Sequence, residues 1–207
     1  MTAKIKNLLF DLGGVIMDLK RDNAVIALKE LGMRDADDFL GLYGQKGPFL
    51  ALEKGLVTPE QFRDMVRRLI GNPDISDKQL DDAFNRFLIG IPVERLRELE
   101  VLRKDYKIFL LSNTNAIMWH SKIADEFRKD GHDINYYFDG IVTSFEEHLY
   151  KPEAAIFDRV FERFKILPQD TLFLDDSLEN VEEARALGIN AEQVLPNTEF
   201  ITYLPKN

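Results

Sequence analysis

Short, continuous apolar runs are the clearest pattern along the chain, and three of them end on polar residues. They occupy residues 8–10, 107–111 and 171–174, and a fourth run covers residues 140–143. A run that is apolar throughout, rather than at alternate positions, predicts a strand buried on both faces. Such strands are typical of parallel sheets.

Segments with apolar residues at helical spacing separate these strands. Residues 93–104, 154–164 and 181–187 have this spacing, and Gly188 ends the last of them. Helices that alternate with buried strands favour an α/β fold. We therefore predict a Rossmann-like parallel sheet that is covered by helices on both faces.

The first strand is separated from the others by a long helical block. Helices are expected at 22–31, 37–43 and 49–54, and two further helices should begin at the capping boxes 58–61 and 76–79. We predict that residues 17–91 form an α-helical cap. The α/β core would then comprise residues 1–16 and 92–207, and the cap could move as a lid because Gly or Pro marks both crossings.

Composition narrows the partners and the compartment. The 207 residues carry a net charge of −9, which argues against nucleic acid and anionic membranes as partners. Cysteine is absent, which suits a reducing compartment. The apolar run near the N-terminus is too short for a secretory signal. We expect a cytoplasmic protein that is a monomer or a small homo-oligomer and acts on a small molecule.

The polar groups after the strands predict the chemistry. Asp11 follows the first strand, Ser112 and Asn113 follow the second, and Asp175 and Asp176 follow the last. Because parallel strands end at one edge of a sheet, these groups should converge there, together with Lys151. Carboxylates, a hydroxyl, an amide and a lysine suit a phosphorylated metabolite beside Mg²⁺. Seen alone, each also fits a turn, a helix cap or a surface lysine.

Four stretches of the chain, in order, resemble the motifs of the haloacid dehalogenase superfamily. They are Asp11-Leu12-Gly13-Gly14-Val15, Leu110-Leu111-Ser112-Asn113, Lys151-Pro152-Glu153 and Leu174-Asp175-Asp176-Ser177. Residues 53–58 resemble a turn common in the small helical caps of that family. The resemblance implies a magnesium-dependent phosphatase, similar to the branch that hydrolyses sugar phosphates such as glucose 1-phosphate.

The resemblance also implies a role for each site residue. Asp11 would attack phosphorus and form an aspartyl-phosphate. Mg²⁺ would lie between Asp11, the carbonyl of Gly13 and Asp176, with Asp175 as a further ligand or as an orienting group. Ser112 and Asn113 would hold the phosphoryl oxygens, and Lys151 would pair with Asp11 and the phosphate. Ser112, Asn113 and Lys151 complete the predicted site.

One position departs from the family pattern. Most phosphatases of this family carry a second aspartate two residues after the nucleophile, which protonates the leaving group, but Gly13 stands there. General acid–base catalysis contributes ~10²–10⁴ in rate, so a slow enzyme or a good leaving group is expected unless Asp18 or Glu53 substitutes. Two alternatives stay open, namely a dehalogenase of the same fold and a protein that binds a phosphorylated ligand without turnover.

Overall fold

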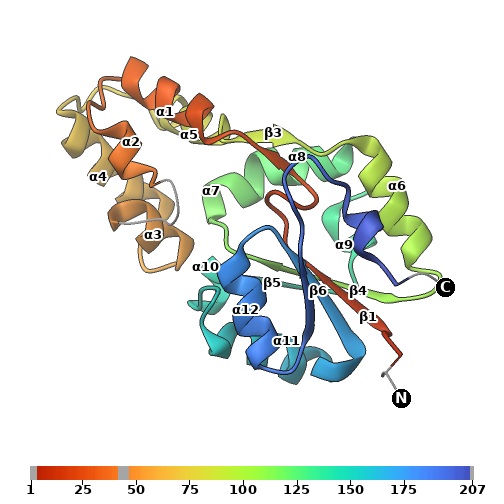
Figure 1. Ribbon diagram of the computed structural model, residues 1–207. Coiled ribbons are helices and arrows are strands. Elements are labelled where there is room, and N and C mark those ends of the chain that lie inside the picture. Colours follow the sequence, from red (N-terminus) through yellow and green to blue (C-terminus); the bar gives the residue numbers. More distant parts are fainter. Residues whose placement is uncertain (1–3, 42–46, 206–207) are drawn as a thin grey trace.

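The computed structural model describes residues 4–41 and 47–205, and its centre is a five-stranded parallel sheet (Figure 1). The strand order is β5-β4-β1-β6-β7. The strands are β1 (Asn7–Phe10), β4 (Lys107–Ser112), β5 (Gly140–Thr143), β6 (Thr171–Asp175) and β7 (Asn190–Gln193). The predicted α/β fold is confirmed.

The register places the ends of three strands side by side. Phe10 of β1 is opposite Leu110 of β4 and Leu174 of β6. Asp11 N–H then donates to the carbonyl of Leu174 at 2.8 Å. The residue after β1 therefore lies next to the last residues of β4 and β6.

Helices cover both faces of the sheet, as the apolar strands predict. On one face, Leu9 and Phe173 pack against α11 (Ala154–Phe164) and α12 (Leu178–Ala186). On the other, Leu8 and Phe10 belong to a cluster with α6 (Val93–Leu102) and α8 (Ala124–Arg128). The remaining elements of the core are α7 (Ala116–Met118), a π-helical turn (Trp119–Ile123), α9 (Ile134–Tyr137), α10 (Ser144–Glu147), and two 3₁₀ turns (Pro168–Asp170, Phe200–Tyr203).

Five helices form a separate lobe beside the core (Figure 1). They are α1 (Arg21–Glu30), α2 (Ala36–Phe39), α3 (Gly47–Glu53), α4 (Pro59–Ile70) and α5 (Asp77–Asn85). Both predicted capping boxes are present: Thr58 accepts from Gln61 N–H and Ser76 from Gln79 N–H. The predicted helix 37–43 is α2, which ends at Phe39, and positions 42–43 lie outside the described residues.

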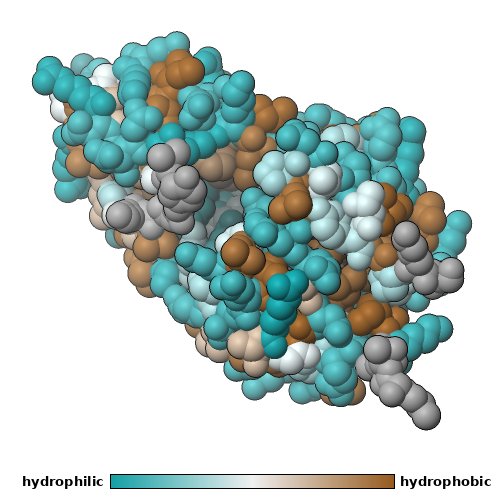
Figure 2. Space-filling view, in the orientation of Figure 1, coloured by the Kyte–Doolittle hydropathy of each residue, from teal (hydrophilic) through white to brown (hydrophobic). Residues whose placement is uncertain are grey.

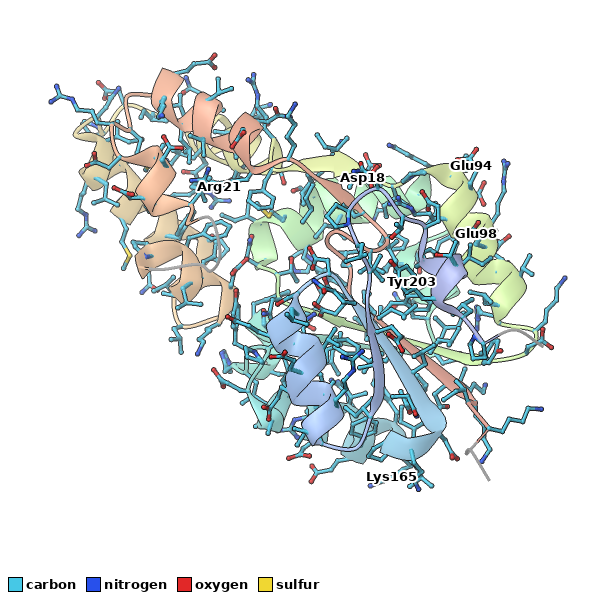
Figure 3. The ribbon with its side chains drawn as sticks, viewed as in Figure 1. Asp18, Arg21, Glu94, Glu98, Lys165 and Tyr203 are labelled. Carbon is cyan, nitrogen blue, oxygen red and sulfur yellow. The ribbon has the colours of Figure 1, made fainter. Side chains whose placement is uncertain are left out.

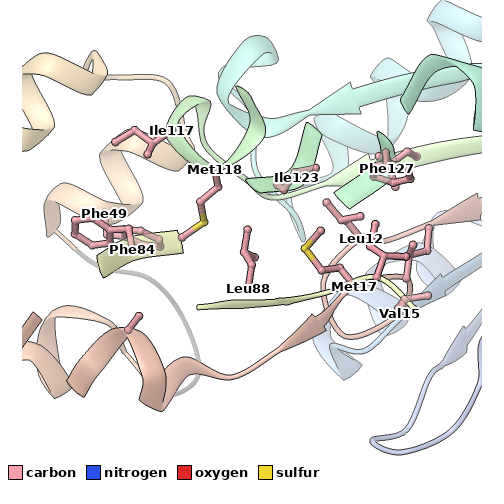
Figure 4. Packing of buried hydrophobic residues seen from close by; sticks show 14 of the residues in the cluster. Leu12, Val15, Met17, Phe49, Phe84, Leu88, Ile117, Met118, Ile123 and Phe127 are labelled. Atoms are coloured by element: carbon pink, nitrogen blue, oxygen red, sulfur yellow. The ribbon is translucent and has the colours of Figure 1, made fainter. Parts of the chain in front are cut away.

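Two short antiparallel strands carry the chain between core and lobe. They are β2 (Asp18–Leu19) and β3 (Leu88–Gly90). The apolar interior continues across this junction, from Phe49 and Phe84 through Met118 and Leu88 to the core (Figure 4). We propose that residues 17–91 are the cap, and that residues 1–16 and 92–207 are the core domain.

Several elements of the core were not predicted. Strand β7 has only one buried residue, Ala191, among polar ones, so its sequence carries no apolar run. Strands β2 and β3 are too short to show a period. Helix α12 begins at Leu178, three residues before its predicted start. Across residues 4–41 and 47–205, no helix combines the length and apolar composition that a membrane crossing requires.

Candidate active site

The end of β1 delivers Asp11 to a buried lysine. The Nζ atom of Lys151 lies 2.7 Å from Asp11 Oδ1 and 2.7 Å from Asp175 Oδ2, and it also donates to the carbonyl of Leu111 at 3.0 Å. Burial alone would lower the pKa of Lys151, but the two carboxylates outweigh it and raise that pKa to about 12. Lys151 is therefore a fixed positive charge that joins the ends of β1, β4 and β6.

Asp175 is fully buried and its two carboxylate oxygens have partners. Oδ2 accepts from Lys151, while Oδ1 accepts from Ser177 N–H at 2.8 Å and from the amide of Asn180 at 2.9 Å. Asn180 lies on α12 and was not predicted as a site residue. Because three groups meet on this carboxylate, Asp175 orients Lys151 and the start of α12.

Asp11, Asp175 and Asp176 form an acidic cluster. One carboxylate oxygen from each lies within 4.8 Å of the others. Burial raises the pKa of Asp11 to about 7; Lys151 opposes that rise, whereas Asp175 and Asp176 add to it. Partial desolvation, together with the charge of Asp175, raises the pKa of Asp176 to about 6, although this residue keeps an exposed surface. Clustered carboxylates that resist ionisation are what a divalent cation neutralises.

The glycine turn after β1 makes room for this cluster. Gly14 has φ +73°, and a Cβ there would lie 2.5 Å from Asp176 Oδ2. Gly14 therefore satisfies both the left-handed backbone and the close approach of Asp176. At Gly13 a Cβ would meet only the end of the Leu19 side chain, at 2.7 Å.

Ser112 at the end of β4 and Asn113 directly after it have different surroundings. Ser112 is buried and lines a cavity together with Gly13 and Asn113. The side chain of Asn113, however, is bonded to the backbone of Lys151: its Oδ1 accepts from Lys151 N–H at 2.9 Å, and its Nδ2 donates to Lys151 C=O at 3.1 Å. Asn113 thus holds the lysine loop in place, a contact that the sequence did not predict.

The cap contributes Glu53 to the same cavity. Glu53 is the last residue of α3 and is only 7% exposed. The hydroxyl of Tyr150 donates to Glu53 Oε2 at 2.8 Å. Burial raises the pKa of Glu53 to about 7, against the opposing effect of that hydrogen bond. Tyr150 precedes Lys151 directly, so the core residue that holds Glu53 is a neighbour of the lysine.

Asp18, the other acid considered for the missing role, lies elsewhere. Its carboxylate pairs with Arg95 at 2.8 Å and is half exposed, at the crossing between core and cap (Figure 3). Arg95 also pairs with Glu199 at 2.7 Å. Asp18 does not line the cavity above Gly13, and its ion pair gives it a structural role.

Space at this site lies between the two lobes. The cavity is lined from the core by Leu12, Gly13, Ser112 and Asn113, and from the cap by Phe49 and Glu53. Figure 2 shows the surface receding where the cap meets the core. The donors fit Mg²⁺, because carboxylates and a backbone carbonyl are the hard oxygen ligands that this ion prefers. The acids that would hold it are the acidic cluster at the sheet edge.

Comparison with known proteins gives concordant results. The sequence matches the family model of haloacid dehalogenase-like hydrolases over residues 5–188. It is 35% identical, over 189 residues, to a D-ribitol-5-phosphate phosphatase from Bacteroides thetaiotaomicron, and the match covers 91% of each chain.

Two solved structures resemble the whole chain. One is a wild-type HAD family enzyme from Bacteroides thetaiotaomicron in complex with magnesium and inorganic phosphate, with a TM-score of 0.91, 38% identity and coverage of 97% of this chain and 100% of that one. The other is a predicted HAD-like family hydrolase from Porphyromonas gingivalis, with a TM-score of 0.90, 34% identity and coverage of 97% and 96%.

Proposed function

The chain belongs to the haloacid dehalogenase-like hydrolase family, and we propose that it hydrolyses the phosphate monoester of a small sugar or sugar alcohol. One observation carries this proposal: Lys151 bridges Asp11 and Asp175 at 2.7 Å each, while Asp176 completes the acidic cluster. This arrangement holds a nucleophilic carboxylate in place and provides charge for a phosphoryl group. The family and the class of enzyme agree with the sequence-based identification.

Asp11 is the nucleophile in this proposal. A carboxylate oxygen of Asp11 attacks phosphorus, the bond from phosphorus to the alcohol oxygen breaks, and an aspartyl-phosphate forms. Water then attacks phosphorus, which releases inorganic phosphate and restores Asp11. Lys151 holds the Asp11 carboxylate in position and neutralises charge on the phosphoryl oxygens, with Ser112 as a hydroxyl donor to them.

Magnesium fits the acidic end of the site. We assign Asp11, Asp176 and the carbonyl of Gly13 as its protein ligands, and Asp175 as an orienting group because both of its oxygens already have partners. When bound, Mg²⁺ would offset the negative charge of the phosphoryl group. Asn113 acts through the backbone of Lys151 rather than through its own amide.

The substrate class follows from a relative and from the cavity. The D-ribitol-5-phosphate phosphatase supports a phosphorylated polyol, and Glu53 with Tyr150 offers hydrogen-bonding groups for hydroxyls. We propose sugar and sugar-alcohol phosphates, with ribitol 5-phosphate and glucose 1-phosphate as the first two probes. We keep the expectations of a cytoplasmic location and of a monomer or small homo-oligomer as proposals.

The test is phosphate release from a panel of these substrates with Mg²⁺ and with EDTA. We expect turnover with Mg²⁺, its loss with EDTA, and its recovery when Mg²⁺ is restored. Asp11→Asn should be inactive on every substrate. Chloride release from a 2-haloacid without metal would instead indicate a dehalogenase. Thermal stabilisation by sugar phosphates without turnover would indicate a ligand-binding protein.

A further inference from the structure

The proposed reaction needs a proton donor that the core does not supply. The leaving alcohol must receive a proton as its bond to phosphorus breaks, and position 13 is a glycine. Among the described residues that line the cavity, Glu53 is the only one with a carboxyl group, and it faces Gly13, Ser112 and Asn113 from the cap side. The cavity that Gly13 and Ser112 line from the core therefore carries an acid from the cap.

Glu53 is fixed in place by the core rather than by its own helix. Ser144 Oγ donates to the Glu53 carbonyl at 2.6 Å and accepts from Thr114 N–H at 2.9 Å, which ties the cap to the loop after β4. Tyr150 holds the carboxyl itself through Oε2, so Oε1 is left to meet a bound molecule.

The next two residues of the cap reinforce this placement. The carbonyl of Lys54 lies 3.1 Å from His148 Nδ1, and Lys54 Nζ pairs with Glu153 at 2.6 Å. Gly55 has φ +63° and passes so close to the core that a Cβ would lie 2.1 Å from the carbonyl oxygen of Phe145. Residues 53–55 thus pack tightly against the core segment 144–153, which fixes Glu53 at the cavity.

We propose that Glu53 is a catalytic residue that protonates the leaving alcohol oxygen, in place of the acid that is missing at position 13. The inference rests on the proposed function. The carboxylic acid of Glu53 gives its proton to the alcohol oxygen while the phosphorus–oxygen bond breaks, and becomes a carboxylate. It then takes a proton from the water that attacks the aspartyl-phosphate, so the acid is regenerated. Tyr150 is a positioning residue for this group.

The electrostatic surroundings suit the role. In residues 4–41 and 47–205, the Glu53 carboxyl forms no ion pair, and its side-chain hydrogen-bond partner is the neutral hydroxyl of Tyr150. A buried carboxyl without a cation keeps its proton to higher pH, and its pKa of about 7 matches a donor that works near neutrality. Burying this carboxyl lowers the stability of the fold, so a role in the reaction, rather than packing, explains an acid at position 53.

The experiment compares two leaving groups. For Glu53→Gln we expect kcat to fall by about 10²–10⁴-fold on ribitol 5-phosphate, whose alkoxide needs a proton, and by less than about tenfold on p-nitrophenyl phosphate, whose phenolate does not. Glu60→Gln is the matched control, because Glu60 is a solvent-exposed glutamate of the same cap. It should leave both rates within about twofold.

A second variant guards against loss of the fold. In Glu53→Ala, formate should restore turnover of ribitol 5-phosphate and leave that of p-nitrophenyl phosphate unchanged. Equal losses on both substrates, a rise in KM alone, or full activity of Glu53→Gln would overturn the inference. These outcomes are distinct from failure of the proposed function, in which the wild-type protein releases no phosphate from either substrate.

Discussion

Two groups of acidic residues, one at the sheet edge and one in the cap, differ in whether a cation accompanies them. At the sheet edge, Lys151 lies between Asp11 and Asp175, so a cation compensates the buried carboxylates. At the cap, Glu53 has a tyrosine hydroxyl as its partner. Three carboxylates with one lysine keep an excess of negative charge, which suits a divalent cation. A buried carboxyl without a cation is suited to carrying a proton, so the proposed reaction would use groups from both lobes.

The largest expected effect comes from Asp11, the proposed nucleophile at the sheet edge. Asp11→Asn keeps the shape but removes the attacking oxygen, so turnover should fall by more than about 10⁴-fold, measured as the initial rate of phosphate release with saturating Mg²⁺. Asp18→Asn, at the exposed ion pair with Arg95, should stay within about threefold of wild type. Substantial turnover by Asp11→Asn would contradict the assignment.

The next effect comes from removing the cation. Lys151→Met leaves the buried carboxylates of Asp11 and Asp175 without a cation, and we expect the free energy of unfolding to drop by about 3–5 kcal/mol. Urea denaturation without added Mg²⁺ measures this change. Lys78→Met removes an exposed ion pair with Asp82 and should cost less than about 1 kcal/mol. Similar losses of unfolding free energy in the two variants would mean that Lys151 does not stabilise the buried carboxylates.

Removing the charge of Glu53 in the cap should raise the free energy of unfolding, whereas removing the charge of Lys151 lowers it. The pKa of Glu53 is about 7 in the folded protein, above its ordinary value of 4.5. The unfolded chain therefore loses this proton at lower pH than the folded protein, and the free energy of unfolding falls as the pH rises from about 4.5 to about 7. Glu53→Gln removes that penalty. It should be more stable than wild type by up to about 3 kcal/mol at pH 8, with little difference at pH 4. Urea titrations at the two pH values test this, and equal stability at pH 8 would be inconsistent with a buried acid.

The smallest effect concerns the contact that brings the two groups of acidic residues together. Gly55→Ala adds a strained backbone and a collision with the carbonyl of Phe145, whereas Gly71→Ala, at φ +76° with open space around it, adds the strain alone. Gly71→Ala should cost about 1 kcal/mol without loss of activity. Gly55→Ala should cost about 1–2 kcal/mol more and lower kcat for sugar phosphates. Thermal unfolding and steady-state kinetics separate the two.

The convergence at the sheet edge was predictable from the sequence, whereas for the cap side the sequence named Asp18 and Glu53 without distinguishing them. Asp11 and Asp175 each follow an apolar run, and parallel strands bring such ends together whatever the rest of the chain does. The bond between Glu53 and Tyr150 joins residues 97 positions apart and exists only because the cap is docked on the core. Neither residue type nor spacing indicates that docking.

Other contacts were missed for local reasons. Asn113 has the residue type of a phosphate ligand, yet its position opposite the Lys151 backbone depends on how the two loops pack. Asn180 orients Asp175 from the first turns of α12, where an asparagine has no distinctive pattern. Strand β7 lies at the edge of the sheet with one buried side chain, so it lacks the apolar run that marked the inner strands.

The central position of β1 in the sheet has a consequence for when the site can form during synthesis of the chain. Its two neighbours, β4 and β6, enter the chain about 100 and 160 positions later, and the lysine that joins them comes from yet another segment. Asp11, Lys151 and the acids at the end of β6 can therefore meet only after the chain has been synthesised beyond Asp176. A nascent chain that stops before β6 lacks Asp175 and Asp176, and we expect it to release no phosphate.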